Sequence, residues 1–287
     1  MIKEHNAGLP MELKSEEGND IHADRKRRPY DFQMMAEHYH HHYELFYLVS
    51  GRCRIFMDHS LYHLEAGDVL LIAPEAIHHT IYGIAQESER IALNFDGSYL
   101  EQMEKECGCR IREQLFGGRK LSIEPGRRSY LENLLQKMQV EQESQDAFSA
   151  LLKKGYLYEL FAFLVRCGRR EAAVEPTDVA EAEIQEAARY IYHHFAEPLT
   201  LEEVAGRVHM TPTYFSRKFK RVTGIGYKEY LNHVRLKEAA RLLLETERSV
   251  TEIALSCGFA DGNYFGDLFK KEKGISPRMY RKNPQIL

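Results

Sequence analysis

The sequence contains no tryptophan, only five cysteines, and no uninterrupted hydrophobic run of the length that spans a membrane. The best candidate, Leu157–Val165, is short and includes Glu159, so we expect no transmembrane segment. The cysteines show no zinc-ribbon spacing, and Cys107 and Cys109 are too close together for a redox CxxC motif. These absences exclude a membrane-spanning protein and a disulfide framework, and they favour reduced thiols in the cytoplasm.

The first 20 residues are polar and acidic and lack the apolar core of a secretory signal. We therefore expect residues 1–29 to form a flexible arm of a cytoplasmic protein. The chain of 287 residues is 44% hydrophobic and 29% charged, as is typical of globular proteins, and its length predicts two domains.

The two parts of the chain differ in charge. Residues 1–183 carry 22 basic and 31 acidic side chains, whereas residues 184–287 carry 17 basic and 12 acidic ones. The basic clusters at 217–221, 270–273 and 278–282 suit a phosphate backbone. Between the two parts, residues 169–183 are small, acidic and interrupted by Pro176, which predicts a linker.

Residues 184–287 contain an internal repeat with a period of about 50 residues. Glu203-Val204-Ala205 recurs as Glu252-Ile253-Ala254, and a one-residue slip then aligns four further motifs. These are Tyr214-Phe215 with Tyr264-Phe265, Phe219-Lys220 with Phe269-Lys270, Gly224-Ile225 with Gly274-Ile275, and Tyr230 with Tyr280. The same supersecondary unit therefore occurs twice.

Each copy of the repeat is expected to form a helix-turn-helix. Capping residues stand at matching positions, with capping boxes at Thr200/Glu203 and Ser249/Glu252 and single caps at Thr211 and Asp261. Between the copies, residues 226–245 have helical apolar spacing, and a helix of this length spans about 30 Å. That is close to the roughly 34 Å between successive major grooves, so one chain could place two recognition helices in adjacent grooves.

With these features, the segment Ile184–Tyr280 resembles the AraC/XylS family of bacterial transcription regulators. The motifs that carry the resemblance are Arg235…Ala239…Leu242-Leu243, Gly258-Phe259…Asp261…Tyr264-Phe265…Phe269-Lys270, and Gly274-Ile275-Ser276-Pro277…Tyr280-Arg281. The resemblance implies that the partner is double-stranded promoter DNA, with RNA polymerase as a further candidate partner. It also implies base contacts from the outward residues of the two recognition helices: Thr213, Ser216, Arg217, Gly262, Asn263, Gly266 and Asp267.

The chemistry of these side chains ranks them. An arginine can bond two acceptors on a guanine edge, so Arg217 is the strongest candidate for base recognition, and Asn263 could do the same for adenine. A carboxylate that faces DNA, as at Asp267, repels phosphates, and Gly262 and Gly266 have no side chain. The second unit is therefore expected to read less sequence than the first. Phosphate contacts, which position without specifying a sequence, are expected from Lys220, Arg221, Lys270 and Lys271.

The N-terminal part shows a different pattern. Residues 43–95 contain short apolar stretches separated by turn residues, at the spacing of an all-β sandwich or barrel. Eight of the 14 histidines lie between His38 and His79. The pattern His38-x-His40-x3-Glu44-x6-Gly51, followed by Gly67-Asp68…Pro74…His78, resembles the two cupin motifs. The resemblance implies a cupin-like barrel or jelly roll over residues 30–125, with His38, His40, Glu44 and His78 converging inside it.

Three interpretations of these histidines stay open. On one strand His38, His40, His42 and Glu44 would share a face, so the candidate effector-pocket residues are His38, His40, His42, Glu44 and His78. Alternatively, His38, His40, Glu44 and His78 could bind a divalent metal, although no cofactor is expected to be required. The histidines could also be a solvated structural feature. Departures from the second motif at Ala73, Glu75 and Tyr82 weaken a catalytic metal site most.

Residues 126–168 change to a helical period and predict a hairpin of two amphipathic helices. Their apolar stripes are Tyr130, Leu131, Leu134, Leu135 and Met138 in the first helix, and Phe148, Leu151, Leu152, Tyr156, Leu160, Phe161 and Leu164 in the second. Resemblance to the family implies that such helices pair two subunits, so we expect a homodimer with the second helix as the better interface candidate.

The sequence thus predicts a two-domain α+β protein. Its parts are a flexible arm (1–29), a cupin-like domain (30–125), a helical hairpin (126–168), a linker (169–183) and an all-α double helix-turn-helix domain (184–287). The expected function is sequence-specific transcription regulation controlled by a small-molecule effector, with a sugar as the first candidate, and not enzymatic catalysis. The alternatives are a metal-dependent cupin enzyme with a helical accessory domain, and a module that binds an acidic partner protein.

Overall fold

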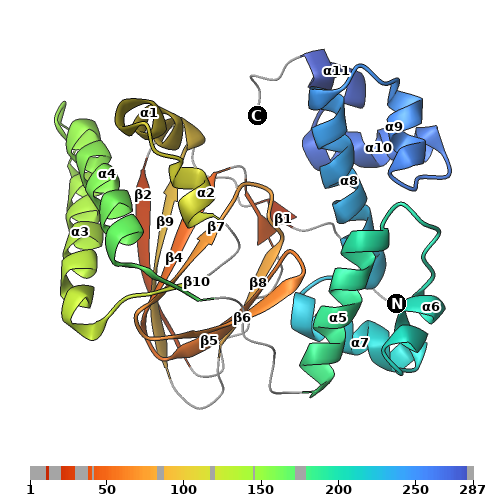
Figure 1. Ribbon diagram of the computed structural model, residues 1–287, viewed down its shortest axis with the longest axis horizontal. Coiled ribbons are helices and arrows are strands. Elements are labelled where there is room, and N and C mark those ends of the chain that lie inside the picture. Colours follow the sequence, from red (N-terminus) through yellow and green to blue (C-terminus); the bar gives the residue numbers. More distant parts are fainter. Residues whose placement is uncertain are drawn as a thin grey trace, which may run out of the picture. The chain divides into compact units, whose positions relative to one another are not determined.

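The computed structural model describes residues 11–12, 21–29, 38–40, 42–82, 87–116, 120–144, 146–171 and 179–282. The chain forms two compact units with a boundary between Glu175 and Pro176: residues 12–175 form one, and residues 176–287 together with residues 1–11 form the other. The unit before the boundary, called the sheet unit, contains the strands and the first four helices, and the unit after it, called the helical unit, contains the remaining helices (Figure 1). None of the helices in the described ranges has the length and hydrophobicity needed to cross a bilayer.

The sheet unit is built from two antiparallel sheets (Figure 1). One has the order β1 (Met11–Glu12), β3 (His38–Tyr39), β8 (His78–Tyr82), β5 (Arg52–Met57), β6 (Ser60–Glu65). The other has the order β11 (Arg169–Glu171), β10 (Lys120–Ser122), β7 (Asp68–Ile72), β4 (Tyr43–Ser50), β9 (Ser88–Phe95), β2 (His22–Arg28). The predicted cupin-like jelly roll is confirmed, in the form of two facing sheets, because the described strands do not close into a barrel.

Strand β4 shows how the sequence produces this sandwich. Side chains along a strand alternate between its two faces. Phe46 and Leu48 belong to a buried cluster shared with β5, β6, β7 and β8, which fills the space between the two sheets. Leu45 and Tyr47 belong to the other cluster, on the outer face of the six-stranded sheet. Both faces of β4 are buried, so this strand reads as a continuous apolar run rather than as an alternating one.

Helices cover the outer face of the six-stranded sheet. After α1 (Gly97–Cys107) and α2 (Ile111–Leu115), the predicted hairpin is formed by α3 (Pro125–Glu143) and α4 (Ser149–Cys167) (Figure 1). Its inner residues join the cluster of Leu45 and Tyr47: Leu131, Leu134, Leu135, Met138, Leu157, Leu160, Phe161 and Leu164. The two apolar stripes of the sequence are only partly buried, because Tyr130, Phe148, Leu151 and Leu152 are exposed.

Two boundaries predicted from the sequence are wrong. The flexible arm assigned to residues 1–29 includes β2, which pairs with β9 over its full length and buries Ala23, while Ile21 before it is also buried. Its charged residues are edge-strand side chains, and Arg25 and Arg27 both bind Glu89, with N–O distances of 3.0 and 3.3 Å. Because much of this edge strand is exposed, it can carry a run of charged residues, and that run does not look like a strand in the sequence.

The linker assigned to residues 169–183 is also shorter than predicted. Residues 169–171 form β11 and pair with β10, and the first helix of the helical unit begins at Val179. Lys120 on β10 holds this edge together through ion pairs with Asp68 on β7 (2.8 Å) and Glu171 on β11 (3.2 Å). β11 has only three residues and all of them are exposed, so it has no hydrophobic pattern from which the sequence could predict a strand.

The described residues 179–282 of the helical unit form seven helices: α5 (Val179–His194), α6 (Leu201–Arg207), α7 (Pro212–Thr223), α8 (Tyr227–Glu245), α9 (Val250–Ser256), α10 (Gly262–Lys273) and α11 (Pro277–Lys282). The predicted caps are present. Capping boxes begin α6 and α9, and the side chains of Thr211 and Asp261 accept backbone N–H bonds at the start of α7 and α10. Both copies of the repeat therefore form the predicted helix-turn-helix, joined by α8.

The turn inside each copy requires a left-handed backbone. Gly258 has φ 83°, and a Cβ atom built there would lie 2.8 Å from the carbonyl oxygens of Phe195 and Ala196. The corresponding residue of the first copy, His209, also has positive φ, at 54°. The two turns therefore share one geometry with different residues, and only the second copy needs glycine for space as well as for conformation.

Two arginines of the helical unit bind helix ends. Arg235 of α8 donates to the carbonyl oxygens of Phe195 (2.7 Å) and Glu197 (2.8 Å), which follow α5. Arg281 of α11 donates to the carbonyl oxygens of Leu243 (3.1 Å) and Arg248, at the end of α8 and beyond it. These cations have structural roles, because they bind backbone carbonyl groups at and just beyond the C-terminal ends of helices.

Candidate functional site

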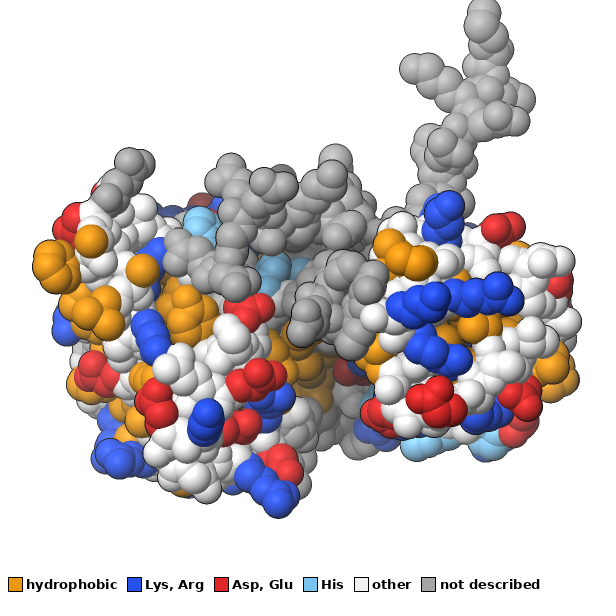
Figure 2. All heavy atoms as spheres, turned by 90° about the horizontal axis from the view of Figure 1, so that it is seen from above, with side chains coloured by type: hydrophobic (Ala, Val, Ile, Leu, Met, Phe, Trp, Pro, Cys, Tyr) orange, Lys and Arg blue, Asp and Glu red, His pale blue; other side chains and the backbone are white. Residues whose placement is uncertain are grey.

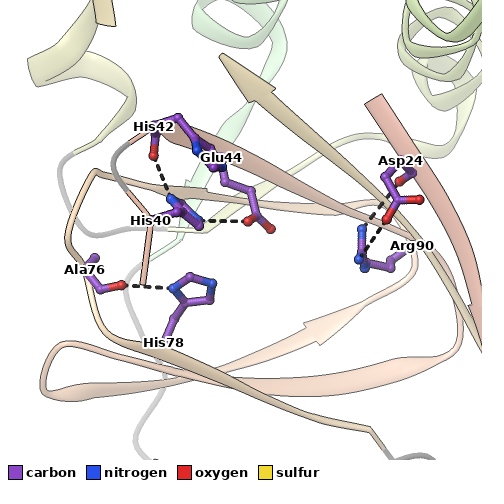
Figure 3. Close-up of polar contacts among 7 residues, drawn as sticks. All are labelled: Asp24, His40, His42, Glu44, Ala76, His78 and Arg90. Carbon is purple, nitrogen blue, oxygen red and sulfur yellow. Dashed lines mark hydrogen bonds and ion pairs between the residues drawn. The ribbon is translucent and has the colours of Figure 1, made fainter. Parts of the chain in front are cut away.

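Three buried side chains converge between the two sheets: His40, Glu44 and His78 (Figure 3). One ligand atom from each lies within 4.8 Å of the other two. The Nε2 atom of His40 is 3.0 Å from the Oε2 atom of Glu44, and the rings of His40 and His78 are 5.1 Å apart in an edge-on arrangement. We call these three residues the His–Glu cluster.

Strand register brings the cluster together. Glu44 lies near the start of β4 and has the same orientation as Phe46 and Leu48, into the space between the sheets. His78 begins β8 in the opposite sheet, directly across from the backbone of His38 on β3. His40 follows β3, and its carbonyl oxygen accepts a hydrogen bond from the backbone N–H of Glu75 at 2.9 Å. Each sheet therefore contributes to the cluster.

Backbone carbonyl groups orient both imidazoles. The Nδ1 atom of His40 donates to the carbonyl oxygen of His42 at 2.7 Å, and the Nδ1 atom of His78 donates to that of Ala76 at 2.9 Å (Figure 3). Because a carbonyl oxygen only accepts, both Nδ1 atoms carry a proton and both rings present Nε2 to the cluster.

The surroundings change the acidity of two members of the cluster. Burial alone would raise the pKa of Glu44, but the hydrogen bond with His40 and the positive charges of His78, His40 and Arg90 outweigh it and hold that pKa well below its usual range. Burial lowers the pKa of His78, although the nearby Glu44 carboxylate opposes this effect. At neutral pH the cluster therefore contains an ionised carboxylate.

Two further polar side chains face the same space and were not identified from the sequence. Arg90 of β9 binds Asp24 of β2 through a 3.2 Å ion pair (Figure 3). It also lies 6.0 Å from the ring centre of Phe46. Asn94 of β9 pairs with Glu44 across the ladder, so both side chains share a face, and its buried Oδ1 atom has no hydrogen-bond partner among the described residues. Only the register of β9 against β4 could have revealed them.

The expectation that one strand carries His38, His40, His42 and Glu44 is wrong. The chain forms β3 and β4 in different sheets, and His40 and His42 belong to neither strand. His42 is half-buried, and its ring stacks on that of His40 with 4.1 Å between the ring centres. The side chain of His38 lies outside the described residues, so its assignment as a pocket residue and metal ligand stays a prediction.

The second candidate site is formed by the helices α7 and α10. Phe215 and Phe219 of α7, and Phe265 and Phe269 of α10, are fully buried, which turns the opposite helix faces to solvent. The predicted DNA-contacting residues are exposed, except for the half-buried Ser216 and Gly266: Thr213, Arg217, Lys220, Arg221, Gly262, Asn263, Asp267, Lys270 and Lys271. Lys and Arg side chains gather on the surface of the helical unit (Figure 2).

The structure also shows which residues of the basic clusters are not on this surface. Lys218, which lies in the first cluster, is buried, and Arg281 of the last cluster binds the end of α8. Conversely, Tyr214 and Tyr264 were left out of the predicted contact set, yet they occupy matching positions near the start of α7 and α10 and are 46% and 45% exposed. Their matching places in the repeat were visible in the sequence, but no role was assigned to them there.

A sheet sandwich with a buried polar site, followed by two exposed helix-turn-helix units, defines a DNA-binding regulator with a ligand-binding domain. Comparison with known proteins agrees. The model of the AraC-like ligand binding domain matches residues 24–161, and that of a helix-turn-helix domain matches residues 204–283. The chain belongs to the AraC/XylS family of transcription regulators.

Individual relatives match the chain over different lengths. The chain is 28% identical over 253 residues to the HTH-type transcriptional regulator YisR of Bacillus subtilis, which covers 84% of this chain and 85% of that protein. It is 37% identical to the HTH-type transcriptional activator RhaS of Escherichia fergusonii over 123 residues. This aligned region covers 43% of this chain and 44% of RhaS. Among solved structures, the C-terminal domain of AraT, a response regulator from Geobacillus stearothermophilus, is 40% identical and covers 35% of this chain and 84% of that one, with a TM-score of 0.35.

These findings confirm the function predicted from the sequence at the level of a DNA-binding transcription regulator with a ligand-binding N-terminal domain. The alternative of a metal-dependent cupin enzyme gains no support, because the relatives are transcription regulators.

Proposed function

We propose that the chain binds a two-part promoter site, with α7 and α10 in successive major grooves, and that a small molecule bound between the two sheets controls this binding. The observation that carries the proposal is that α7 and α10, at corresponding positions of the two repeat copies, each have one exposed face opposite their buried phenylalanines. The connecting helix α8 has 19 residues and therefore spans about 28 Å, which suits two grooves on one side of a duplex.

The two recognition helices have different roles in this proposal. On α7, Thr213, Ser216 and Arg217 contact bases, and Arg217 reads a guanine through two hydrogen bonds. On α10, Asn263 is the main candidate for base recognition, since Gly262 and Gly266 lack side chains and Asp267 is acidic. The basic residues contact phosphates and contribute affinity without sequence preference: Lys220, Arg221, Lys270 and Lys271.

The effector site in this proposal is the polar space around the His–Glu cluster. Arg90 and Asn94 add a cation and an amide from β9, on the sheet face that carries Glu44, to the imidazoles and the carboxylate. This set suits a small molecule rich in hydroxyl groups, such as a sugar. The dimer exists in an equilibrium between different arrangements of its two DNA-binding domains. The effector has a higher affinity for the protein in one of these arrangements, so effector binding shifts the equilibrium toward it.

The homodimer forms through the hairpin. On α4, Phe148 and Leu151 are 68% and 66% exposed, and Val140 of α3 is also exposed, which makes an apolar surface on the outside of the sheet unit (Figure 2). Leu151→Glu should shift the full-length protein from dimer to monomer in analytical ultracentrifugation. The matched control is Lys105→Glu on α1, a charge change at an exposed site of the same unit. Equal molecular mass for all three proteins would contradict this interface.

Regulation takes place in the cytoplasm, where the bound protein meets RNA polymerase and activates transcription, and it requires no catalytic step. The proposal of activation rests on the relative RhaS, whose description is that of an activator.

Selection of duplexes from a random DNA pool by the purified full-length protein tests the DNA-binding part of the proposal. The expected result is an enriched motif with two half-elements about one helical turn apart. The control is the double variant Lys220→Ala/Lys270→Ala, which should enrich the same motif at lower yield. Binding to the pool without any enriched sequence would contradict the proposal.

A further inference from the structure

We propose that Cys107 and Cys109 form a dithiol that a low-molecular-weight disulfide, such as oxidised glutathione, reversibly oxidises to an intramolecular disulfide. The two residues flank Gly108 in the turn between α1 and α2, where both side chains are exposed and both thiols are free. One residue separates them, so their spacing differs from that of a CxxC motif. The geometry of the turn is what makes them a pair.

The backbone of the turn brings the two cysteines together. Cys107 is the last residue of α1, and Gly108 ends the helix in the left-handed conformation, with φ 68° and ψ 13°. The N–H group of Gly108 donates to the carbonyl oxygen of Glu104 at 2.9 Å. In a helical turn of this kind, residues two apart have Cα atoms about 5.5 Å apart, which is a separation that a disulfide can bridge. Glycine adopts this conformation at little steric cost.

The two side chains also interact. The backbone N–H of Cys109 donates to the sulfur of Cys107 at 3.4 Å, and the thiol of Cys109 donates to the carbonyl oxygen of Cys107 at 3.6 Å. The neighbouring Cys107 thiol raises the pKa of Cys109 through a side-chain hydrogen bond. Outside α1 and the adjacent residues, no described atom lies within 4 Å of a Cβ atom built on Gly108. Rotation of the two side chains can therefore form the S–S bond without displacing the core.

The other three cysteines, which also lie in the described ranges, differ from this pair. Cys53 and Cys257 are buried, and burial raises the pKa of both thiols, that of Cys257 to about 11. Cys167 is half-buried at the end of α4, where Arg127 donates to its sulfur at 2.9 Å. Exchange with a disulfide requires a thiol that is accessible and can ionise. The two exposed thiols of the chain are therefore also the two that adjoin one another in a turn.

The oxidation takes place in two exchange steps. The thiolate of one cysteine attacks a sulfur of oxidised glutathione, which forms a mixed disulfide and releases one glutathione. The thiolate of the other cysteine then attacks the protein sulfur of the mixed disulfide, closes the ring and releases the second glutathione. Two protein thiols are oxidised, one external disulfide is reduced, and the two protons pass to the released glutathiones.

The spacing of the cysteines favours this sequence of steps and its reversal. Because the second thiol is only one residue away, ring closure is intramolecular and outpaces the attack of a second glutathione molecule. A disulfide that closes so small a ring is strained, and strained disulfides are readily reduced. The pair is therefore suited to reversible oxidation rather than to a permanent cross-link.

Exchange with glutathione tests the inference in the full-length protein. Reduced protein is incubated in buffers with an increasing ratio of oxidised to reduced glutathione, quenched with acid, digested with trypsin and analysed by mass spectrometry. Cleavage after Lys105 and Arg110 releases residues 106–110, which contain both cysteines, so one peptide reports the state of the pair. In wild type we expect the bridged peptide, which has lost two hydrogen atoms, to exceed the glutathione-bound peptide at least tenfold. Cys107→Ser and Cys109→Ser should each stop at the mixed disulfide.

The matched control is Cys167→Ser, which removes a thiol of the same unit outside the turn and should be oxidised as wild type is. The inference is overturned if the wild-type peptide carries glutathione on both cysteines, or if either cysteine is bridged to Cys167 instead. A wild-type peptide that stays reduced over the whole series also overturns it. The measurement uses neither DNA nor an effector, so its result is independent of the proposed function.

Discussion

The two helix-turn-helix units share a backbone plan, yet they present different chemistry to DNA. Both begin with capping boxes, bury paired phenylalanines and turn through a residue of positive φ. On the outer face, α7 presents Arg217 where α10 presents Asp267, and α10 has glycine at two outward positions. The comparison teaches that one set of residues maintains the fold of the repeat, while a separate set on the opposite helix face is free to diverge in function.

The largest expected effect is a loss of stability caused by a substitution in the turn of the second helix-turn-helix unit. Gly258→Ala should lower the free energy of unfolding by about 3 kcal/mol, because the alanine Cβ adds a clash with two carbonyl oxygens to the cost of a left-handed backbone. Chemical denaturation of the full-length protein measures the change. His209→Ala is the matched variant in the first unit and should cost clearly less. A Gly258→Ala protein as stable as wild type would show that the second turn can rearrange.

The next effect concerns sequence recognition. Arg217→Ala should weaken binding to a selected site by about 1–3 kcal/mol and relax the preference at one base position, since a bidentate contact is lost. Asn263→Ala in the second unit is the comparison, and it should change the preference in the other half-element only. Fluorescence anisotropy with duplexes mutated at each position gives both values. An unchanged base preference in Arg217→Ala would remove this residue from the recognition set.

A smaller effect separates positioning from recognition. Lys270→Ala should weaken binding to specific and random duplexes alike and reduce the slope of log affinity against log salt by about one. Titrations over a series of salt concentrations measure this slope. Lys218→Ala provides the contrast, because this lysine is buried and should affect stability rather than the salt dependence. A salt slope that Lys270→Ala does not change would exclude a phosphate contact.

The smallest effect sharpens the comparison of the two turns. His209→Gly should raise the free energy of unfolding by about 0.5 kcal/mol, because glycine removes the cost of positive φ but increases the entropy of the unfolded chain. The measurement is a denaturation curve beside that of wild type. A loss of stability would mean that the exposed imidazole contributes more than the backbone costs.

The helical unit was more predictable from the sequence than the sheet unit, and the reason is physical. Caps, turns and helical apolar spacing act over a few residues, so Thr200, Ser249 and Gly258 identify their elements locally. Strand β2 was missed because its pairing with β9 is nonlocal and its sequence resembles a solvated charged segment. His40, Glu44 and His78 were found through motif spacing, whereas Arg90 and Asn94 enter the site only through cross-strand register, which a single sequence does not encode locally.

The short strand β11 gives the sheet unit a mechanical property. It is hydrogen-bonded to β10, β10 to β7, and β7 to β4, the strand that contains Glu44. β11 ends at Glu171 and α5 begins at Val179, so the sheet fixes the chain as far as Glu171. Lys120 stabilises this edge through ion pairs with Asp68 on β7 and Glu171 on β11. A displacement of β4 would therefore be passed to the last residues of the sheet unit through three consecutive strand pairings.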